Sequence, residues 1–126
     1  MYSLNYGSED YVVEQITGNL YRIRKFDRPD EEFTITFEVE CRNYGQYFKI
    51  HHLYKNGRTY DSSRFHYKYI PLIREATTLI WLEEGLFSYT LNRFISFKEA
   101  YCYRFGIEKW EECYKRMAAR YKLAMQ

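Results

Sequence analysis

The sequence predicts an α+β fold: an N-terminal antiparallel β-meander of about five strands, with about three C-terminal helices packed on one face. Two observations lead to this prediction. Residues 33–41 alternate apolar and polar side chains with a period of two, which is typical of a half-buried strand. From residue 107 onward the apolar residues instead follow the helical period and form a single stripe.

The length of 126 residues fits one domain with a buried core. We expect residues 1–10 to be loosely ordered, residues 11–67 to form the sheet and residues 71–124 to form the helices. No run approaches the roughly 18 apolar residues of a membrane span, and the N-terminus lacks the apolar stretch of a signal peptide. We therefore expect a soluble, cytoplasmic (intracellular) protein that makes no membrane contact.

Three turns set the predicted register of the sheet. Gly18-Asn19 separates two apolar runs and suits a two-residue hairpin. Asn56-Gly57 is the strongest hairpin signal, because both central residues of a type I′ turn need positive φ. It places Lys55 opposite Arg58 and Lys49 opposite Arg64. A loop at 42–45 then sets Glu38 opposite Lys49.

The two registers agree on which side chains face the core. The inward set is apolar and consists of Phe33, Ile35, Phe37, Val39, Phe48, Ile50, Tyr54 and Phe65. Residues between them fall outward, because successive side chains of a strand point to opposite faces.

Helix boundaries are indicated by prolines, glycines and one cap. Pro71 suits the first turn of a helix that runs to about Glu84 and stops at Gly85. Ser96 and Glu99 have the spacing of a capping box, which predicts a second helix up to about Gly106. A last helix is expected over 107–122, with its apolar stripe in the core.

Charge is distributed unevenly, although the net charge is only +2. Residues 1–40 carry four basic and nine acidic side chains, whereas residues 41–74 carry seven basic and one acidic, a net charge of +6. Residues 75–126 carry eight basic and seven acidic side chains. The chain also has 15 tyrosines, which are enriched where proteins meet partners. These features favour a binding surface for a negatively charged partner.

Catalytic and metal sites are poorly supported by the sequence. Cys41, Cys102 and Cys113 show no C-x-x-C spacing, so neither a disulfide framework nor a zinc site is indicated. His51 and His52 are neighbours on a strand and point to opposite faces, so they cannot share a metal ion. No Gly-rich phosphate loop, Walker lysine or H-E-x-x-H motif is present, and we expect no cofactor.

One pair keeps an enzymatic alternative open. His52 falls opposite Asp61, and a carboxylate can fix an imidazole tautomer and raise its basicity. A small hydrolase or nuclease could use this pair, but no nucleophile motif accompanies it. The favoured interpretation is a buried structural pair. A DNA-reading helix-turn-helix over 97–117 is also disfavoured, because Glu108, Glu111 and Glu112 would face the phosphates.

The candidate binding site is the outward face of the two strands that flank Asn56-Gly57. It combines basic and aromatic side chains: Tyr47, Lys49, His51, Lys55, Arg58, Tyr60, Arg64 and His66. Rings beside Lys or Arg on an open sheet face can stack on bases while the charges meet phosphates. We interpret the protein as a small non-enzymatic binding module for a phosphate-bearing ligand, nucleic acid or a nucleotide.

Two alternatives use the same surface. One is a protein-interaction or inhibitor module, of the mobile-element or phage counter-defence type, that blocks an acidic or nucleic-acid-binding protein partner. The other is an ordinary solvated sheet face, partly neutralised by Glu38 and Glu40 on the neighbouring strand.

Overall fold

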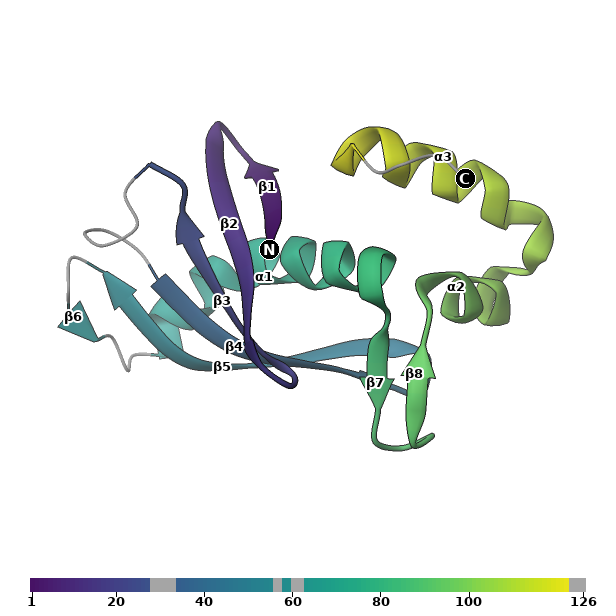
Figure 1. Cartoon of the computed structure of the whole chain (residues 1–126), viewed down its shortest axis with the longest axis horizontal. Helices are drawn as coiled ribbons and strands as arrows, with labels where there is room; N and C mark the ends of the chain where they lie inside the picture. The colour runs from purple at the N-terminus through teal and green to yellow at the C-terminus, as the bar shows by residue number, and fades with distance from the viewer. Residues whose placement is uncertain (28–33, 56–57, 60–62, 123–126) are drawn as a thin grey trace.

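The computed structural model describes residues 1–27, 34–55, 58–59 and 63–122, with the backbone alone at 63–66. It confirms the α+β class: an antiparallel sheet whose six strands lie in chain order is followed by three helices (Figure 1). The strands of this sheet are β1 (Tyr2–Tyr6), β2 (Glu9–Thr17), β3 (Leu20–Lys25), β4 (Thr34–Arg42), β5 (Gly45–Lys55) and β6 (Arg58–Thr59).

Much of the predicted register is confirmed. Thr17 lies opposite Leu20, so Gly18-Asn19 forms the β2–β3 turn. Arg42 lies opposite Gly45, and the two residues between them both have positive φ. Glu38 lies opposite Lys49, and Lys55 lies opposite Arg58, as the turns predict.

A β-bulge interrupts β5 and changes which of its side chains face the core. Phe37 lies opposite Ile50, but Thr36 lies opposite His52, which leaves His51 as the additional residue of β5. The alternation therefore shifts by one beyond the bulge. Leu53 is buried, with 1% of its surface exposed, whereas the prediction that Tyr54 faces the core is wrong.

The inner face of the sheet holds the core. Ile23, Ile35 and Phe37 are fully buried there, and Phe48 and Ile50 are half-buried at the side of β5. Phe33 lies outside the described residues, and Phe65 belongs to the helix that follows β6, where only the backbone is described.

Helix α1 (Ser63–Glu84) lies across this inner face, and no helix of the described residues covers the outer face (Figure 1). It begins earlier than predicted, so Pro71 lies inside the helix and not in its first turn. Consequently the second half of the predicted hairpin is short: β6 ends at Thr59, and residues from Ser63 onward are helical. The helix ends at Glu84, as predicted, and Gly85 follows with a φ of 82°.

The remaining elements follow the C-terminal end of α1, and the last of them turns back toward α1 and β1 (Figure 1). They are the hairpin β7 (Leu86–Ser88) and β8 (Arg93–Ile95), helix α2 (Phe97–Phe105), the 3₁₀ turn η1 (Ile107–Lys109) and helix α3 (Trp110–Tyr121). This hairpin is absent from the elements expected from the sequence. Ser96 caps α2 by accepting a hydrogen bond from the backbone N–H of Glu99 at 3.0 Å, as the capping signal indicates.

Both ends of the chain that the structure describes are anchored. The first ten residues are not loose, because β1 pairs with β2 and Leu4 is buried. At the other end, the Arg120 guanidinium and the Tyr121 hydroxyl of α3 both donate to the carboxylate of Glu75 on α1. None of the helices in the described ranges is long and apolar enough to cross a membrane.

Candidate ligand-binding site

The residues predicted to form one basic face are divided between different parts of the structure. Tyr47, Lys49 and His51 are exposed on β5. Lys55 and Arg58 lie opposite each other. Beyond the bulge, however, Lys55 lies on the same face of β5 as the buried Leu53, which is the inner face. The prediction of a single face is therefore wrong for the end of this hairpin.

The other three predicted residues do not lie on a described strand. Arg64 and His66 belong to α1, so the expected opposition of Lys49 and Arg64 across two strands is not formed. Tyr60 lies outside the described residues. The mismatch arises because the segment after β6 turns into a helix instead of continuing the ladder.

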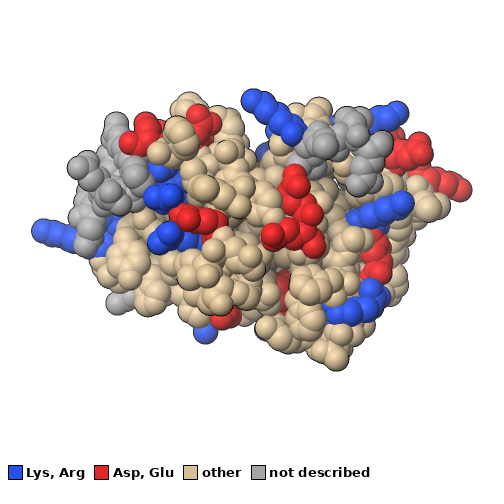
Figure 2. All heavy atoms as spheres, viewed as in Figure 1, with Lys and Arg blue, Asp and Glu red and all other residues tan. Residues whose placement is uncertain are grey.

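The outer face of the sheet also has a nearly balanced charge. Figure 2 shows Lys and Arg interspersed with Asp and Glu on the side in view, without a continuous area of one sign. Among the described residues, three ion pairs lie on this face: Arg22–Glu14 at 3.0 Å, Arg24–Glu14 at 2.8 Å and Arg42–Glu40 at 2.7 Å. The imidazole of His51 also lies 3.3 Å from the carboxylate of Glu38. The ring of Tyr47 is itself covered, by the guanidinium of Arg42 at 3.7 Å.

The prediction of a buried pair between His52 and Asp61 is wrong for His52. His52 lies opposite Thr36 and is exposed, because the bulge turns it to the outer face. Asp61 lies outside the described residues. Among the described residues, no three His, Cys, Asp or Glu side chains are grouped in a way that could hold a metal ion.

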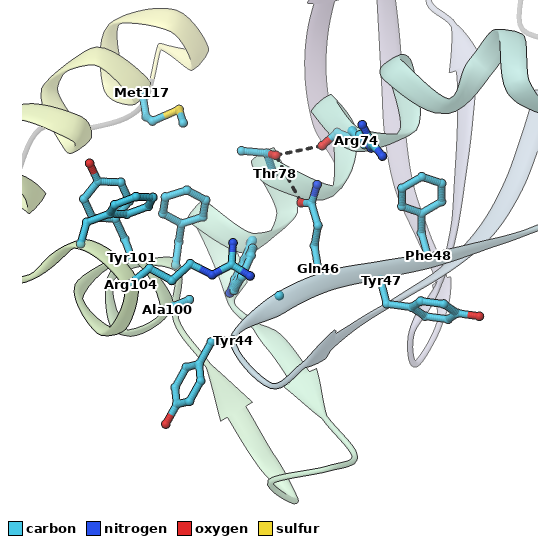
Figure 3. A pocket seen from close by; sticks show the side chains of 14 residues that line it. Tyr44, Gln46, Tyr47, Phe48, Arg74, Thr78, Ala100, Tyr101, Arg104 and Met117 are labelled. Atoms are coloured by element: carbon cyan, nitrogen blue, oxygen red, sulfur yellow. Dashed lines mark hydrogen bonds between the residues drawn. The ribbon is translucent and has the colours of Figure 1, made fainter.

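A pocket of about 540 Å³ lies where the start of β5 meets α1, α2 and α3 (Figure 3). Its volume is in the usual range for small-molecule sites. It is lined mainly by aromatic and polar side chains: Tyr44, Gln46, Tyr47, Phe48, Arg74, Thr78, Trp81, Phe97, Tyr101, Arg104, Phe105 and Met117, with Gly45 and Ala100.

Two arginines supply the charge of this pocket. Arg74 comes from α1 and Arg104 from the last turn of α2, and both are exposed. Within the described part of the chain, neither guanidinium forms an ion pair with a carboxylate. The described residues that line the pocket include no Asp, Glu, His or Cys, so their formal charge is positive.

The guanidinium of Arg104 lies against Gly45, a residue without a side chain. A Cβ atom at Gly45 would lie 3.2 Å from an Nη atom of Arg104, closer than ordinary packing allows. Gly45 thus leaves room for the guanidinium over the start of β5. The nearby thiol of Cys41 is no candidate nucleophile, because burial raises its pKa and Glu99 adds to that effect, which Arg104 only partly opposes.

Aromatic rings form the wall opposite β5 and are held by mutual contacts. Trp81 packs its ring edge-on against Phe97 at 5.2 Å, and Phe97 stacks with Tyr101 at 6.4 Å. The indole Nε1 of Trp81 donates a hydrogen bond to the carbonyl oxygen of Ile95 at 2.8 Å. These contacts fix the wall before any ligand arrives.

The rim of the pocket contains a strained tyrosine. Tyr44 has a φ of 64°, a left-handed conformation that is unusual for a bulky residue. Its ring stacks on Tyr103 of α2 with centroids 4.1 Å apart and planes 12° apart. This stack joins the β4–β5 turn to α2. Local strain of this kind is concentrated at functional sites.

A polar link closes the side between β5 and α1. The hydroxyl of Thr78 donates to the carbonyl oxygen of Arg74 at 2.9 Å and lies 3.4 Å from the amide oxygen of Gln46 (Figure 3). The link leaves the amide nitrogen of Gln46 as an additional donor beside the two arginines.

A second cavity, of about 840 Å³, lies between the end of α1, β8 and α3. It is larger but carries mixed charge, since Glu83, Glu84 and Glu111 line it together with Lys98 and Lys115. The smaller pocket is the better candidate because its charged groups have one sign and no carboxylate partner.

The chain matches no protein-family model, no curated protein and no solved structure in the comparisons made with it. The candidate site therefore depends on its own geometry. Sequence reasoning did not select its two arginines, which come from different helices, thirty positions apart in the chain. Arg74 was only counted within the basic segment 41–74, and no local pattern connects it to Arg104.

Proposed function

We propose that this protein is a non-enzymatic binding module for a phosphate-bearing ligand of the nucleotide class, held in the pocket between β5 and the three helices. One observation supports the proposal: two guanidinium groups that have no carboxylate partner among the described residues line the same pocket as a wall of aromatic rings. Guanidinium groups bind phosphate oxygens in a bidentate manner, and aromatic rings stack on any of the nucleic-acid bases.

In this proposal each side of the pocket has its own role. Arg74 and Arg104 take the phosphate, while Phe48, Trp81 and Tyr101 contact the base. A free nucleotide and the end of a single-stranded nucleic acid present the same unit to this pocket. Ligands of either kind are consistent with the intracellular location expected from the sequence.

The absence of carboxylate, imidazole and thiol groups from the lining favours binding over catalysis, since these groups carry most acid–base and nucleophilic chemistry. An acidic segment of a protein partner is the competing occupant, because it would also neutralise both arginines. This is the inhibitor interpretation of the sequence, and the experiment below separates the two.

The test uses Trp81 as a reporter. The chain has two tryptophans, so Trp110→Phe leaves Trp81, which lines the pocket, as the single tryptophan, and its emission can be excited selectively over that of the tyrosines. ATP, AMP, adenosine and a short oligothymidylate are titrated at about 50 and 200 mM salt, a range over which phosphate binding weakens strongly. We expect AMP or ATP to quench the fluorescence and adenosine, which lacks phosphate, to bind much more weakly.

Two variants localise the binding. Arg74→Met and Arg104→Met should each weaken nucleotide binding by about tenfold or more, as expected for losing a charged hydrogen bond. Arg116→Met, which removes an exposed arginine of α3 outside the pocket, is the matched control and should change little. No binding of any phosphate-bearing probe at about 1 mM would exclude this function. Quenching by poly-glutamate alone would support the acidic protein partner.

A further inference from the structure

Strand β5 has an unpaired outer edge. On one side it pairs with β4 from Gly45 to Tyr54, with His51 left out at the bulge. On the other side, within the described ranges, only Tyr54 and Lys55 pair with β6. Among the described residues, no further backbone hydrogen bond reaches Gly45–Leu53 from that side. An edge of this kind presents free N–H and C=O groups to an extended chain.

The side chains along this edge differ between its two faces. Phe48 and Ile50 are half-buried on the inner side, where they pack against the core below α1. Tyr47 and Lys49 are exposed on the outer side. Because a strand alternates, an added strand would place every second residue beside the apolar pair and the others beside Lys49.

The charge of β5 selects the partner. Its eleven residues include Lys49, Lys55 and two histidines but no acidic residue. Two copies of β5 brought edge to edge would place like charges together, which destabilises a pair of strands. An incoming strand with carboxylates on its outer face would instead be attracted to Lys49.

The bulge at His51 restricts the usable part of the edge. Bulges and lysines are common devices by which proteins keep their edge strands from pairing with copies of themselves. The regular part of the edge is therefore Gln46–Ile50, before the bulge.

From this combination we propose that the outer edge of β5 at Gln46–Ile50 binds an extended, acidic segment of a protein partner by strand addition, with apolar and acidic residues alternating. The proposal differs from nucleotide binding in using the backbone edge of β5 and Lys49, which does not line the pocket, although Gln46, Tyr47 and Phe48 are shared with the pocket lining.

The probe is a fluorescein-labelled peptide that alternates Val and Glu over about seven residues, close to the usual length of a strand. Two further peptides carry N-methyl groups on alternate residues, one on the odd and one on the even positions. A strand donates from only one edge to its neighbour, so we expect one N-methylated peptide to bind about tenfold more weakly and the other to bind as the parent does. Equal binding of both N-methylated peptides, or no binding of the parent at about 1 mM, would overturn the proposal.

Two controls localise the contact. Lys49→Glu should weaken binding of the acidic peptide by about tenfold, whereas Arg116→Glu on α3 should leave its affinity unchanged. Equal effects of the two substitutions would overturn the proposal. Changes in the amide chemical shifts on addition of the peptide should be concentrated at residues 45–50. Changes concentrated on β1 or α3 would contradict the proposal. Nucleotide titrations of the same Lys49→Glu protein separate the two proposals, because Lys49 does not line the pocket. Nucleotide binding should be kept while binding of the acidic peptide is weakened.

Discussion

The indole nitrogen of Trp81 donates its hydrogen bond to the backbone of Ile95, which ties the last turns of α1 to strand β8. Trp81 is 6% exposed, so the carbonyl oxygen it satisfies has little access to water. The contact also fixes one wall of the candidate pocket.

Trp81→Phe should therefore lower the free energy of unfolding by about 1–3 kcal/mol, because it leaves a buried hydrogen-bond acceptor without a partner. Urea unfolding followed by circular dichroism measures the change. Trp110→Phe is the matched control, because Trp110 is only half-buried, and it should cost less. Equal losses for the two variants would show that the hydrogen bond contributes nothing specific.

The bulge in β5 makes a prediction for two neighbouring residues. Leu53→Ala should cost about 2–5 kcal/mol, since it empties a fully buried site. Tyr54→Ala should cost less than about 1 kcal/mol, because Tyr54 is 37% exposed on the outer face. Denaturant midpoints of both variants at one pH provide the comparison. A reversed order would mean that β5 is regular and has no bulge.

The register of β5 shows what the sequence predicts well and what it does not. The turn residues fix how strands begin to pair, so the register at Val39–Phe48 and Lys55–Arg58 is correct. The bulge lies between these turns and carries no local signal, because both neighbouring residues are histidines. The additional residue then reverses the side chains of β5 beyond the bulge, so that Leu53 and not Tyr54 faces the core.

Helix α1 illustrates a second limit. Residues 58–67 contain enough aromatic and basic residues to be interpreted as a strand that returns from Asn56-Gly57. Packing of α1 against the inner face extends the helix back to Ser63 and overrides that local preference. The candidate pocket was missed for a related reason, because Arg74 and Arg104 line one pocket only through the arrangement of α1 and α2.

The position of Pro71 inside α1 can be tested directly. A proline in a helix interior lacks a hydrogen-bond donor and costs about 3 kcal/mol relative to alanine, partly offset by its effect on the unfolded chain. Pro71→Ala should thus raise the free energy of unfolding by about 1–2 kcal/mol. A neutral or negative change in a thermal unfolding experiment would instead favour a helix that starts at Pro71.

A buried tyrosine makes the stability sensitive to alkaline pH. The Tyr21 hydroxyl donates to Glu84 at 3.1 Å, and burial, reinforced by the charge of Glu84, raises the pKa of Tyr21 well above its ordinary value of 10.0. Above the ordinary pKa of 10.0, the unfolded chain loses the Tyr21 proton while the folded chain keeps it. The free energy of unfolding therefore falls as the pH rises.

The loss should reach up to about 1.4 kcal/mol per pH unit from this one group, and Tyr21→Phe should flatten the slope accordingly. Urea unfolding at a series of pH values from neutral to strongly alkaline measures both proteins. Tyr67→Phe, at an exposed tyrosine of α1, is the control and should keep the wild-type slope. An unchanged slope in Tyr21→Phe would contradict the assignment.

Strand order in the large sheet follows chain order from β1 to β6, so each strand pairs with its neighbour in sequence. Most of the contacts that define the sheet therefore close short loops, and the contact order of this part is low for a β structure. Low contact order favours fast folding, because little chain entropy is lost before pairing begins. By contrast, the bonds from Arg120 and Tyr121 to Glu75 bridge 45 and 46 positions. We expect the sheet to form early in folding and α3 to dock last, which stopped-flow experiments can resolve through the fluorescence of Trp81 and Trp110.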